Sequence, residues 1–190
     1  MIASRNELAV FTRADYESLP DEGRWEVAHG SAVLLPPPPY WHQELSDDLV
    51  AELRRWVRAK GCGFVASAVA VFIPVPPGVQ SEVQSRTPDI VVSTERAEGQ
   101  FNSGVPPEWV IEILSTRRGN VERTEKMDDY ARAGIGEYWL VNVIDRQVEV
   151  YALSAGDYAL VQKTAQPQSI SFPGVEIDMM PLWPQRPIAQ

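Results

Sequence analysis

The chain has 190 residues, of which 44% are hydrophobic and 23% charged, so it can bury a sizeable core and has the composition of an ordinary globular protein. Its single cysteine, Cys62, cannot form an internal disulfide, and with only two histidines it cannot build a plausible zinc site. The formal net charge of −9 argues against tight, sequence-independent binding to DNA, because such binding relies on basic residues that contact phosphates.

No segment of the sequence suggests export or insertion into a membrane. The first seven residues are too polar for a signal peptide, and no apolar run reaches membrane-spanning length. We therefore expect a cytoplasmic protein without a membrane partner. We see no internal repeat or linker, so we expect a single domain over residues 1–190, with peripheral strands and a loose tail from about residue 157.

A short helix and a hairpin are predicted at the start of the chain. Thr12 and Asp15 have the spacing of a capping box, which predicts a helix that runs to about Leu19 and is stopped by the following proline. Two strands are predicted next, at 24–28 and 31–35. The His-Gly dipeptide between them can supply the positive φ of a tight hairpin, mainly through its glycine.

A long helix and two strands are predicted for the next part of the chain. Residues 41–59 should form the helix, because apolar side chains recur every three or four positions: Leu45, Leu49, Leu53 and Trp56. Residues 63–73, rich in Val and Phe, and the apolar run 88–93 predict strands. The proline-rich stretch 74–84 between them predicts a loop, and the polar stretch 94–107 a surface loop.

The strand around which the sequence is organised is predicted at Trp109–Ser115. It is an apolar run with several β-branched residues, bounded by two prolines and a polar Arg-Gly-Asn segment. Side chains alternate along a strand. One face should therefore carry Trp109, Ile111 and Ile113, and the other Val110, Glu112 and Leu114.

The remainder of the chain predicts one helix and four strands. The helix is expected over 120–133, with these inward residues: Val121, Met127, Tyr130 and Ala131. Strands 137–143 and 148–151 should form a hairpin, and shorter strands are expected at 158–163 and 169–177. This order of helices and strands predicts a mixed α/β layer fold.

Two carboxylates lie in strands that otherwise look buried. Glu112 is in the middle of its strand, and Asp89 stands at the head of the strand at 88–93. A buried, unpaired carboxylate is costly unless a partner or a metal ion compensates its charge, or its pKa shifts. Lys126 falls within the following helix. Two acids on neighbouring strands, which lie roughly 5 Å apart, together with a lysine indicate a metal-dependent phosphodiesterase.

The chemistry of phosphodiester hydrolysis suits these residues. Mg²⁺ or Mn²⁺ held by Asp89 and Glu112 could activate water and polarise the phosphate, with a backbone carbonyl such as that of Ile113 as a third ligand. Lys126 would orient the water or stabilise charge in the transition state. The negative net charge is compatible with such a site, because the metal ion brings phosphate close to acidic residues.

Several short motifs together resemble a known family. They are Pro88-Asp89-Ile-Val-Val, Trp109-Val-Ile-Glu112-Ile-Leu-Ser115, Glu125-Lys126, Tyr130-Ala-Arg-Ala-Gly134 and Glu137-Tyr-Trp-Leu-Val141. In this order and spacing they resemble the large bacterial Uma-type family, which is labelled as restriction endonucleases and belongs to the PD-(D/E)XK phosphodiesterase superfamily. The likeness extends over nearly the whole chain, which makes it more specific than any one motif.

The resemblance implies an α/β fold with a mixed central β-sheet flanked by helices, as in restriction endonucleases, and a Mg²⁺-dependent DNA endonuclease. Asp89 matches the motif aspartate and Glu112 the second metal-binding acid. The lysine that usually stands two positions after that acid is replaced by Leu114, and the resemblance assigns its role to Lys126 on the following helix. Glu26 matches an acid at the edge of the site.

Structural roles remain open for the same residues. Asp89 could simply begin a strand after a proline, and Glu112 could form a structural ion pair with Lys126. Lys126 could equally be exposed to solvent, like most helix lysines, and Glu26 could be an exposed strand residue. His42 is predicted to cap or pack its helix rather than act as a base. His29 is predicted as a turn residue.

A second class of function fits the sequence as well. The chain could be a catalytically silent, restriction-endonuclease-like module for interaction or assembly. The alternatives differ in whether Asp89, Glu112 and Lys126 converge on one accessible pocket. Either class could form a two-fold homodimer, for which we expect exposed aromatic residues to pair between chains: Tyr138, Trp139 and Tyr151.

Overall fold

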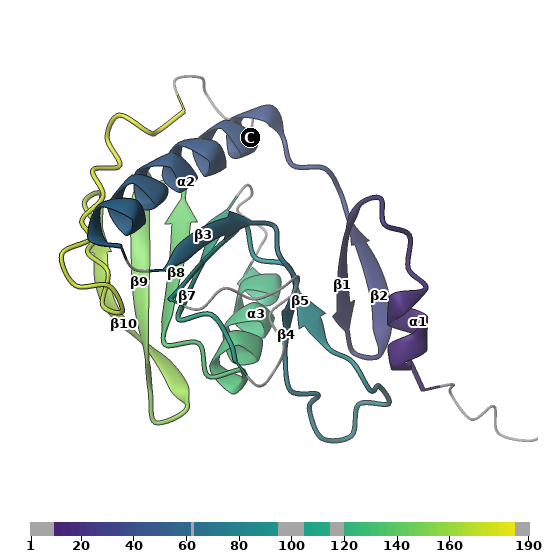
Figure 1. Cartoon of the computed structure of the whole chain (residues 1–190). Coiled ribbons are helices and arrows are strands. Elements are labelled where there is room, and N and C mark those ends of the chain that lie inside the picture. The colour runs from purple at the N-terminus through teal and green to yellow at the C-terminus, as the bar shows by residue number, and fades with distance from the viewer. Residues whose placement is uncertain (1–9, 62, 95–104, 115–119, 185–190) are drawn as a thin grey trace, which may run out of the picture.

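The computed structural model describes residues 10–61, 63–94, 105–114 and 120–184, with only the backbone described for 120–123. Two β-sheets organise this part of the chain (Figure 1). The larger sheet has the spatial order β10 (Asp157–Thr164), β9 (Gln147–Ser154), β8 (Glu137–Asn142), β7 (Trp109–Leu114), β6 (Ile90–Ser93) and β3 (Phe64–Ser67). The smaller sheet has the order β2 (Ser31–Leu35), β1 (Arg24–Ala28), β5 (Ser85–Arg86) and β4 (Val71–Phe72).

The larger sheet is mixed. Strands β7 and β8 run parallel, and the other neighbouring strands run antiparallel. A parallel pair needs a long crossover connection, which here contains helix α3 (Asn120–Arg132). The predicted α/β class, with a mixed central sheet flanked by helices, is confirmed.

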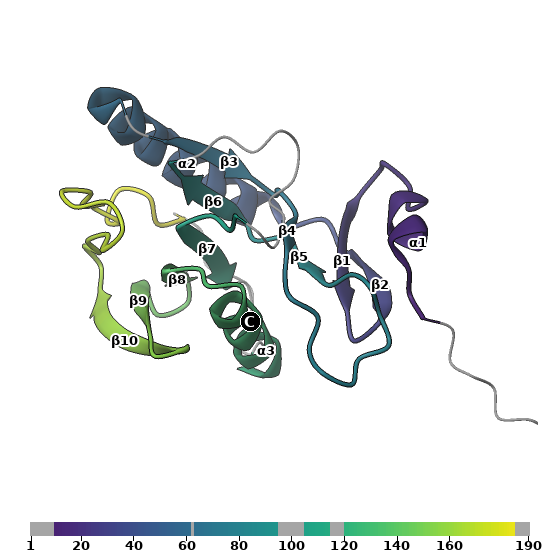
Figure 2. The same ribbon diagram turned by 60° about the horizontal axis from the view of Figure 1, so that its bottom comes forward.

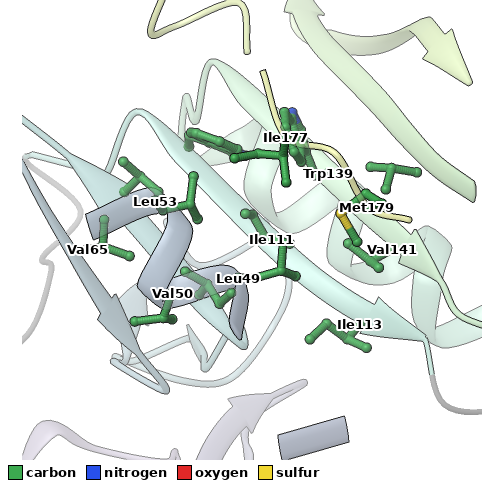
Figure 3. Packing of buried hydrophobic residues seen from close by; sticks show 14 of the residues in the cluster. Leu49, Val50, Leu53, Val65, Ile111, Ile113, Trp139, Val141, Ile177 and Met179 are labelled. Atoms are coloured by element: carbon green, nitrogen blue, oxygen red, sulfur yellow. The ribbon is translucent and has the colours of Figure 1, made fainter. Parts of the chain in front are cut away.

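Helix α2 (Tyr40–Lys60) covers one face of the larger sheet. Its predicted stripe is confirmed, because Leu45, Leu49 and Leu53 are buried in one cluster with Ile111 and Trp139 of the sheet. Figure 3 shows several of these side chains in contact. The same face is covered by buried residues of the C-terminal segment: Phe172, Val175, Ile177, Met179 and Trp183. Within the described part of the chain, no helix combines the length and hydropathy needed to cross a membrane.

Helix α3 covers the opposite face, so the sheet lies between α2 and α3 (Figures 1 and 2). Tyr130 of α3 is fully buried in a second cluster with Val110, Tyr138 and Leu140 of the sheet. The alternation predicted for β7 is confirmed, since its odd-numbered residues join the α2 cluster and Val110 joins the α3 cluster. Glu112 therefore points to the α3 face.

The N-terminal hairpin and helix form as predicted. Helix α1 (Arg13–Glu17) carries the predicted capping box between Thr12 and Asp15 and ends slightly earlier than expected. Strands β1 and β2 pair antiparallel over the predicted ranges. Both residues of the turn have positive φ, 53° at His29 and 75° at Gly30, so the turn does not rely on its glycine alone.

The single strand predicted over 63–73 is wrong. The chain forms β3 and β4 there, which belong to different sheets. Between them Ala68 adopts a left-handed backbone with a φ of 52°, which turns the chain out of the larger sheet. Strand β5 was not predicted, because a two-residue strand carries no detectable alternation.

The strand predicted over 169–177 is also wrong. The described segment has only one isolated pairing, between Gln168 and Glu176. Its position is fixed instead by the fully buried carboxylate of Glu137, which accepts hydrogen bonds from the Ser169 hydroxyl at 2.8 Å and from the amide of Ser171 at 2.6 Å. A side-chain anchor replaces the backbone ladder.

The aromatic residues expected at an interface between chains are buried. Tyr138 and Trp139 belong to the two sides of the core, and Tyr151 is 7% exposed. The expectation that these side chains are exposed was wrong. They lie on interior strands of the larger sheet, where both faces are covered by other parts of the chain. The homodimer stays a prediction without this support.

The anchor at Glu137 can be tested directly. Replacing Glu137 with Ala should lower the free energy of unfolding by about 3 kcal/mol or more, because several buried hydrogen-bond donors lose a charged acceptor. Urea denaturation would measure this loss. The control is Glu176→Ala, which removes an exposed acid from the C-terminal segment that Glu137 anchors. It should change stability by less than about 0.5 kcal/mol. Equal losses in both variants would contradict the anchoring role.

Candidate active site

Glu112 meets two side chains of α3 on the inner face of the larger sheet. Its Oε1 accepts hydrogen bonds from Lys126 Nζ at 3.1 Å and from Tyr130 Oη at 2.6 Å. Lys126 and Tyr130 are four residues apart, so they lie on the same face of the helix and reach the same carboxylate. Because the carboxylate is 8% exposed, both contacts lie in a largely desolvated environment.

The smaller sheet contributes Glu26 to this cluster. Lys126 Nζ lies 3.3 Å from Glu26 Oε1, so one ammonium group bridges two carboxylates. Glu26 is held in turn by the amide of Thr87 at 3.0 Å and by Arg86 Nη1 at 3.1 Å from its second oxygen. The predicted edge acid is therefore buried between the two sheets.

Asp89 lies immediately before β6 and has partners of its own. Its Oδ2 accepts a hydrogen bond from the amide of Ile113 at 2.8 Å and lies 3.2 Å from His42 Nε2. Its Oδ1 accepts a hydrogen bond from Arg24 Nη2 at 3.2 Å. Since Ile90 pairs with Ile111 in antiparallel register, Asp89 lies at the level of Glu112 on the neighbouring strand.

The pKa of Glu112 is raised from 4.5 to about 7. Burial is the largest cause, and repulsion from Asp89 and Glu26 adds to it. The ammonium of Lys126 and the hydrogen bond from Tyr130 favour the charged form and offset only part of this shift. Burial and the two neighbouring acids therefore outweigh the cation that contacts Glu112.

For Lys126 and Asp89, in contrast, the surroundings favour the charged form. Burial works against charge on both Lys126 and Asp89, but their partners outweigh it. The acids Glu112 and Glu26 raise the pKa of Lys126, and contacts with His42, the Ile113 amide and Arg24 lower the pKa of Asp89. Lys126 is therefore a cation and Asp89 an anion at neutral pH.

The donors at this site fit a hard divalent cation that keeps most of its water shell. Asp89 and Glu112 supply carboxylate oxygens, which Mg²⁺ prefers. The raised pKa of Glu112 marks a place where added positive charge would favour ionisation. Among the described residues, no three His, Cys, Asp or Glu side chains form a ready-made metal cluster. The site could therefore offer a metal ion one or two protein carboxylates, and water molecules would supply the remaining ligands.

The sequence interpretation missed the outer part of this network. Arg86 Nε lies 2.6 Å from Asp129 Oδ2, and Gln84 Nε2 donates to Asp129 Oδ1 at 2.8 Å. Asp129 follows Lys126 by three positions on α3, a spacing that could have placed it on the inward face. Tyr130 was predicted as an inward packing residue, but its hydrogen bond to Glu112 was not foreseen.

The other candidates have simpler surroundings. His29 occupies the hairpin turn as predicted, with its exposed ring 3.4 Å from Glu125. His42 does more than pack its helix, because it contacts Asp89. Cys62 and residues 115–119, which include two arginines, lie outside the described residues.

Comparisons with known proteins bear on this arrangement. The family model described as "Uma2: Putative restriction endonuclease" matches residues 13–180. The search of curated proteins gives no match. The fold resembles the crystal structure of a "putative nuclease belonging to DUF820" from Anabaena variabilis, with 20% identity and a TM-score of 0.68, over 90% of this chain and 96% of that one. The predicted restriction-endonuclease-like fold is confirmed.

The raised pKa of Glu112 predicts a specific pH dependence of stability. The folded protein holds a proton on Glu112 up to about pH 7, whereas the unfolded chain releases it near pH 4.5, so ionisation opposes folding as the pH rises between these values. Glu112→Gln should remove this pH-dependent loss of stability, because glutamine does not ionise. Relative to wild type, the variant should gain up to about 3 kcal/mol between pH 5 and pH 8.

Chemical denaturation at a series of pH values would measure this difference. Glu44→Gln, an exposed acid on α2, is the matched control and should show a difference that does not change with pH. A relative loss of stability in Glu112→Gln at high pH would mean instead that Glu112 is ionised and that Lys126 stabilises it.

Proposed function

We propose that this chain, which belongs to the Uma2 family described as putative restriction endonucleases, is a nuclease that uses Mg²⁺ or Mn²⁺ to hydrolyse DNA. The family match and the solved neighbour described as a putative nuclease both support a nuclease of restriction-endonuclease type. The observation that carries the metal-dependent part is the buried Glu112, whose pKa is raised to about 7 first by burial and then by repulsion from Asp89 and Glu26.

Asp89 and Glu112 would hold the metal ion, and the carbonyl of Ile113 would be a third ligand. Bound there, the ion would lower the pKa of a water molecule and polarise a phosphate oxygen. The hydrogen bonds from His42 and the Ile113 amide hold one Asp89 oxygen in place and favour its charged form. This carboxylate is therefore ionised and oriented before any cation arrives.

Lys126 would stabilise the charge that develops on phosphate. Burial lowers the pKa of its ammonium group, but Glu112 and Glu26 outweigh this effect and keep the group protonated, so it can act as a fixed point charge. Glu26 would be a positioning residue, because its contact at 3.3 Å holds Lys126 when Glu112 turns toward a cation. Tyr130 would keep Glu112 oriented as a neutral donor, since burial and the charge of Glu112 raise the pKa of the phenol.

One observation favours the silent interaction module as the second candidate. The oxygens of Asp89 have partners from the protein itself, and Lys126 already lies on Glu112. A site of this kind can be stable without any metal ion. The two candidates differ in whether added metal competes successfully with these internal partners.

Metal titration distinguishes these candidates without a known substrate. We expect Mn²⁺ and Mg²⁺ to release or absorb heat on binding to the wild type, and both Asp89→Asn and Glu112→Gln to abolish this signal. A concentration of metal about 100 times the Kd should stabilise the wild type by about 2.7 kcal/mol. Absence of both effects in the wild type would support the silent module and overturn the nuclease proposal.

The role of Lys126 gives a separate prediction. Lys126→Gln leaves two buried acids without their shared cation and should cost about 3 kcal/mol or more at pH 8 in the presence of a chelator. Mg²⁺ should then raise the melting temperature of the variant more than that of the wild type, because the ion no longer competes with an ammonium group. DNA cleavage should fall by about 100-fold or more.

The matched control is Arg55→Gln, which removes an exposed cation paired with Glu52 at 2.7 Å on α2. It should lose less than about 1 kcal/mol and respond to Mg²⁺ like the wild type. If Lys126→Gln is stable in the chelator and indifferent to Mg²⁺, the acids around it do not form a cation site.

A further inference from the structure

A hollow of about 530 Å³ lies beside the Asp89 end of the candidate site. Its walls come from α1, the first residues of β1, the link between β3 and β4, and Thr87. Its volume falls within the range of sites that bind small molecules and nucleotides. Arg24 lines the hollow and also contacts Asp89, so one side chain connects the two places.

Arg24 uses only part of its hydrogen-bonding capacity. Its Nη2 donates both to the carbonyl of Thr87 at 3.1 Å and to Asp89 at 3.2 Å, whereas its Nε is buried without a hydrogen-bond partner. A buried N–H without an acceptor is uncommon and unfavourable. A guanidinium group pairs best with phosphate through two parallel N–H groups. The Arg24 side chain is 25% exposed, so a phosphate in the hollow would meet its accessible N–H groups and add a charged acceptor.

The hollow also has aromatic walls. The indole of Trp25 is held in place by its own hydrogen bond to the carbonyl of Pro20 at 3.2 Å. The ring of Tyr16 is fixed edge-on against Phe72, with 5.2 Å between ring centroids. Rigid aromatic side chains next to an arginine are typical of sites that bind single-stranded nucleic acid by stacking on the bases.

The charges in the outer part of the hollow favour a base over a chain of phosphates. Arg13 is 3.5 Å from Glu17, which compensates its charge, and Asp21 adds a further acid. A continuous phosphate backbone would be repelled there, whereas an uncharged base would not. Of the two described arginines that line the hollow, Arg24 is the one that contacts the Asp89 carboxylate and could meet a phosphate there.

We propose that this hollow binds one unpaired nucleotide of the substrate strand. Arg24 and Trp25 are adjacent on β1 and point to opposite faces of the strand, so the nucleotide would span the start of β1, with its base against the indole of Trp25 and its phosphate against Arg24. The inference rests on the proposed nuclease function and narrows its substrate to single-stranded DNA. A base within a duplex could enter only after unpairing and unstacking, which costs free energy.

Fluorescence anisotropy tests this proposal without cleavage. The probe is a labelled single strand of about 12 nucleotides, compared with the duplex of the same sequence, in a buffer that contains a chelator. We expect the wild type to bind the single strand about tenfold more tightly. Trp25→Leu should remove most of this preference and Trp25→Phe should retain it, because stacking contributes roughly five- to 150-fold per base.

Two further variants separate the nucleotide contact from damage to the fold. Ala70→Leu fills part of the hollow from another lining position and leaves Arg24 and Trp25 unchanged, and it should weaken binding of the single strand about tenfold. Arg24→Gln should weaken binding and reduce its salt dependence by about one ion. Arg58→Gln on the exposed face of α2 is the matched control and should not change the preference.

The outcomes also distinguish this inference from the proposed function. Equal or tighter binding of the duplex, or unchanged binding in both Trp25→Leu and Ala70→Leu, would overturn the nucleotide site even if metal binding and cleavage are observed. Strand preference that depends on these residues, in a protein that binds no metal, would uphold the site and refute the nuclease.

Discussion

One buried ammonium group, that of Lys126, holds the candidate site together. It bridges Glu112 of the larger sheet and Glu26 of the smaller sheet at 3.1 and 3.3 Å. Desolvation makes each of these charges costly alone, so the three groups stabilise one another only as a set. Burial, and then repulsion from Asp89 and Glu26, still raises the pKa of Glu112 to about 7. A cation bound beside Glu112 would favour the ionised form of this carboxyl group.

The smaller sheet supplies two of the charged side chains at the candidate site. Strand β1 presents Arg24 and Glu26 on one face, two residues apart, and each meets a different part of the site. Arg24 contacts Asp89, and Glu26 contacts Lys126. The small sheet is therefore more than a peripheral addition, because without it the site would lose both a cation and an anion. Its position next to the larger sheet also creates the hollow that Arg24 lines.

Much of the fold could be predicted from local pattern. The stripe on α2, the alternation of β7 and the β1–β2 hairpin each depend on periodicity or turn chemistry within a short window. The two-residue strands β4 and β5 have no such period, and the left-handed turn at Ala68 has no sequence signal. The C-terminal segment is fixed by Glu137, a contact between residues more than 30 positions apart.

Some residues of the candidate site could also be predicted from local sequence, whereas others could not. Glu112 could be identified because a lone acid in an apolar strand conflicts with its surroundings, whereas Glu26 was found only through family resemblance. The pairing of Arg86 with Asp129 joins residues 43 positions apart and leaves no local pattern. His42 looked like a packing residue, because nothing in the helix itself shows that it faces Asp89 across the core.

The proposed mechanism depends on a cation site beside the buried carboxyl group of Glu112. The most direct measurement is a pH titration of the Glu112 carboxyl carbon by ¹³C NMR, with and without saturating Mg²⁺. Our account predicts titration near pH 7 without metal and a midpoint displaced well downward when Mg²⁺ is present. A midpoint that is the same with and without Mg²⁺ would contradict it.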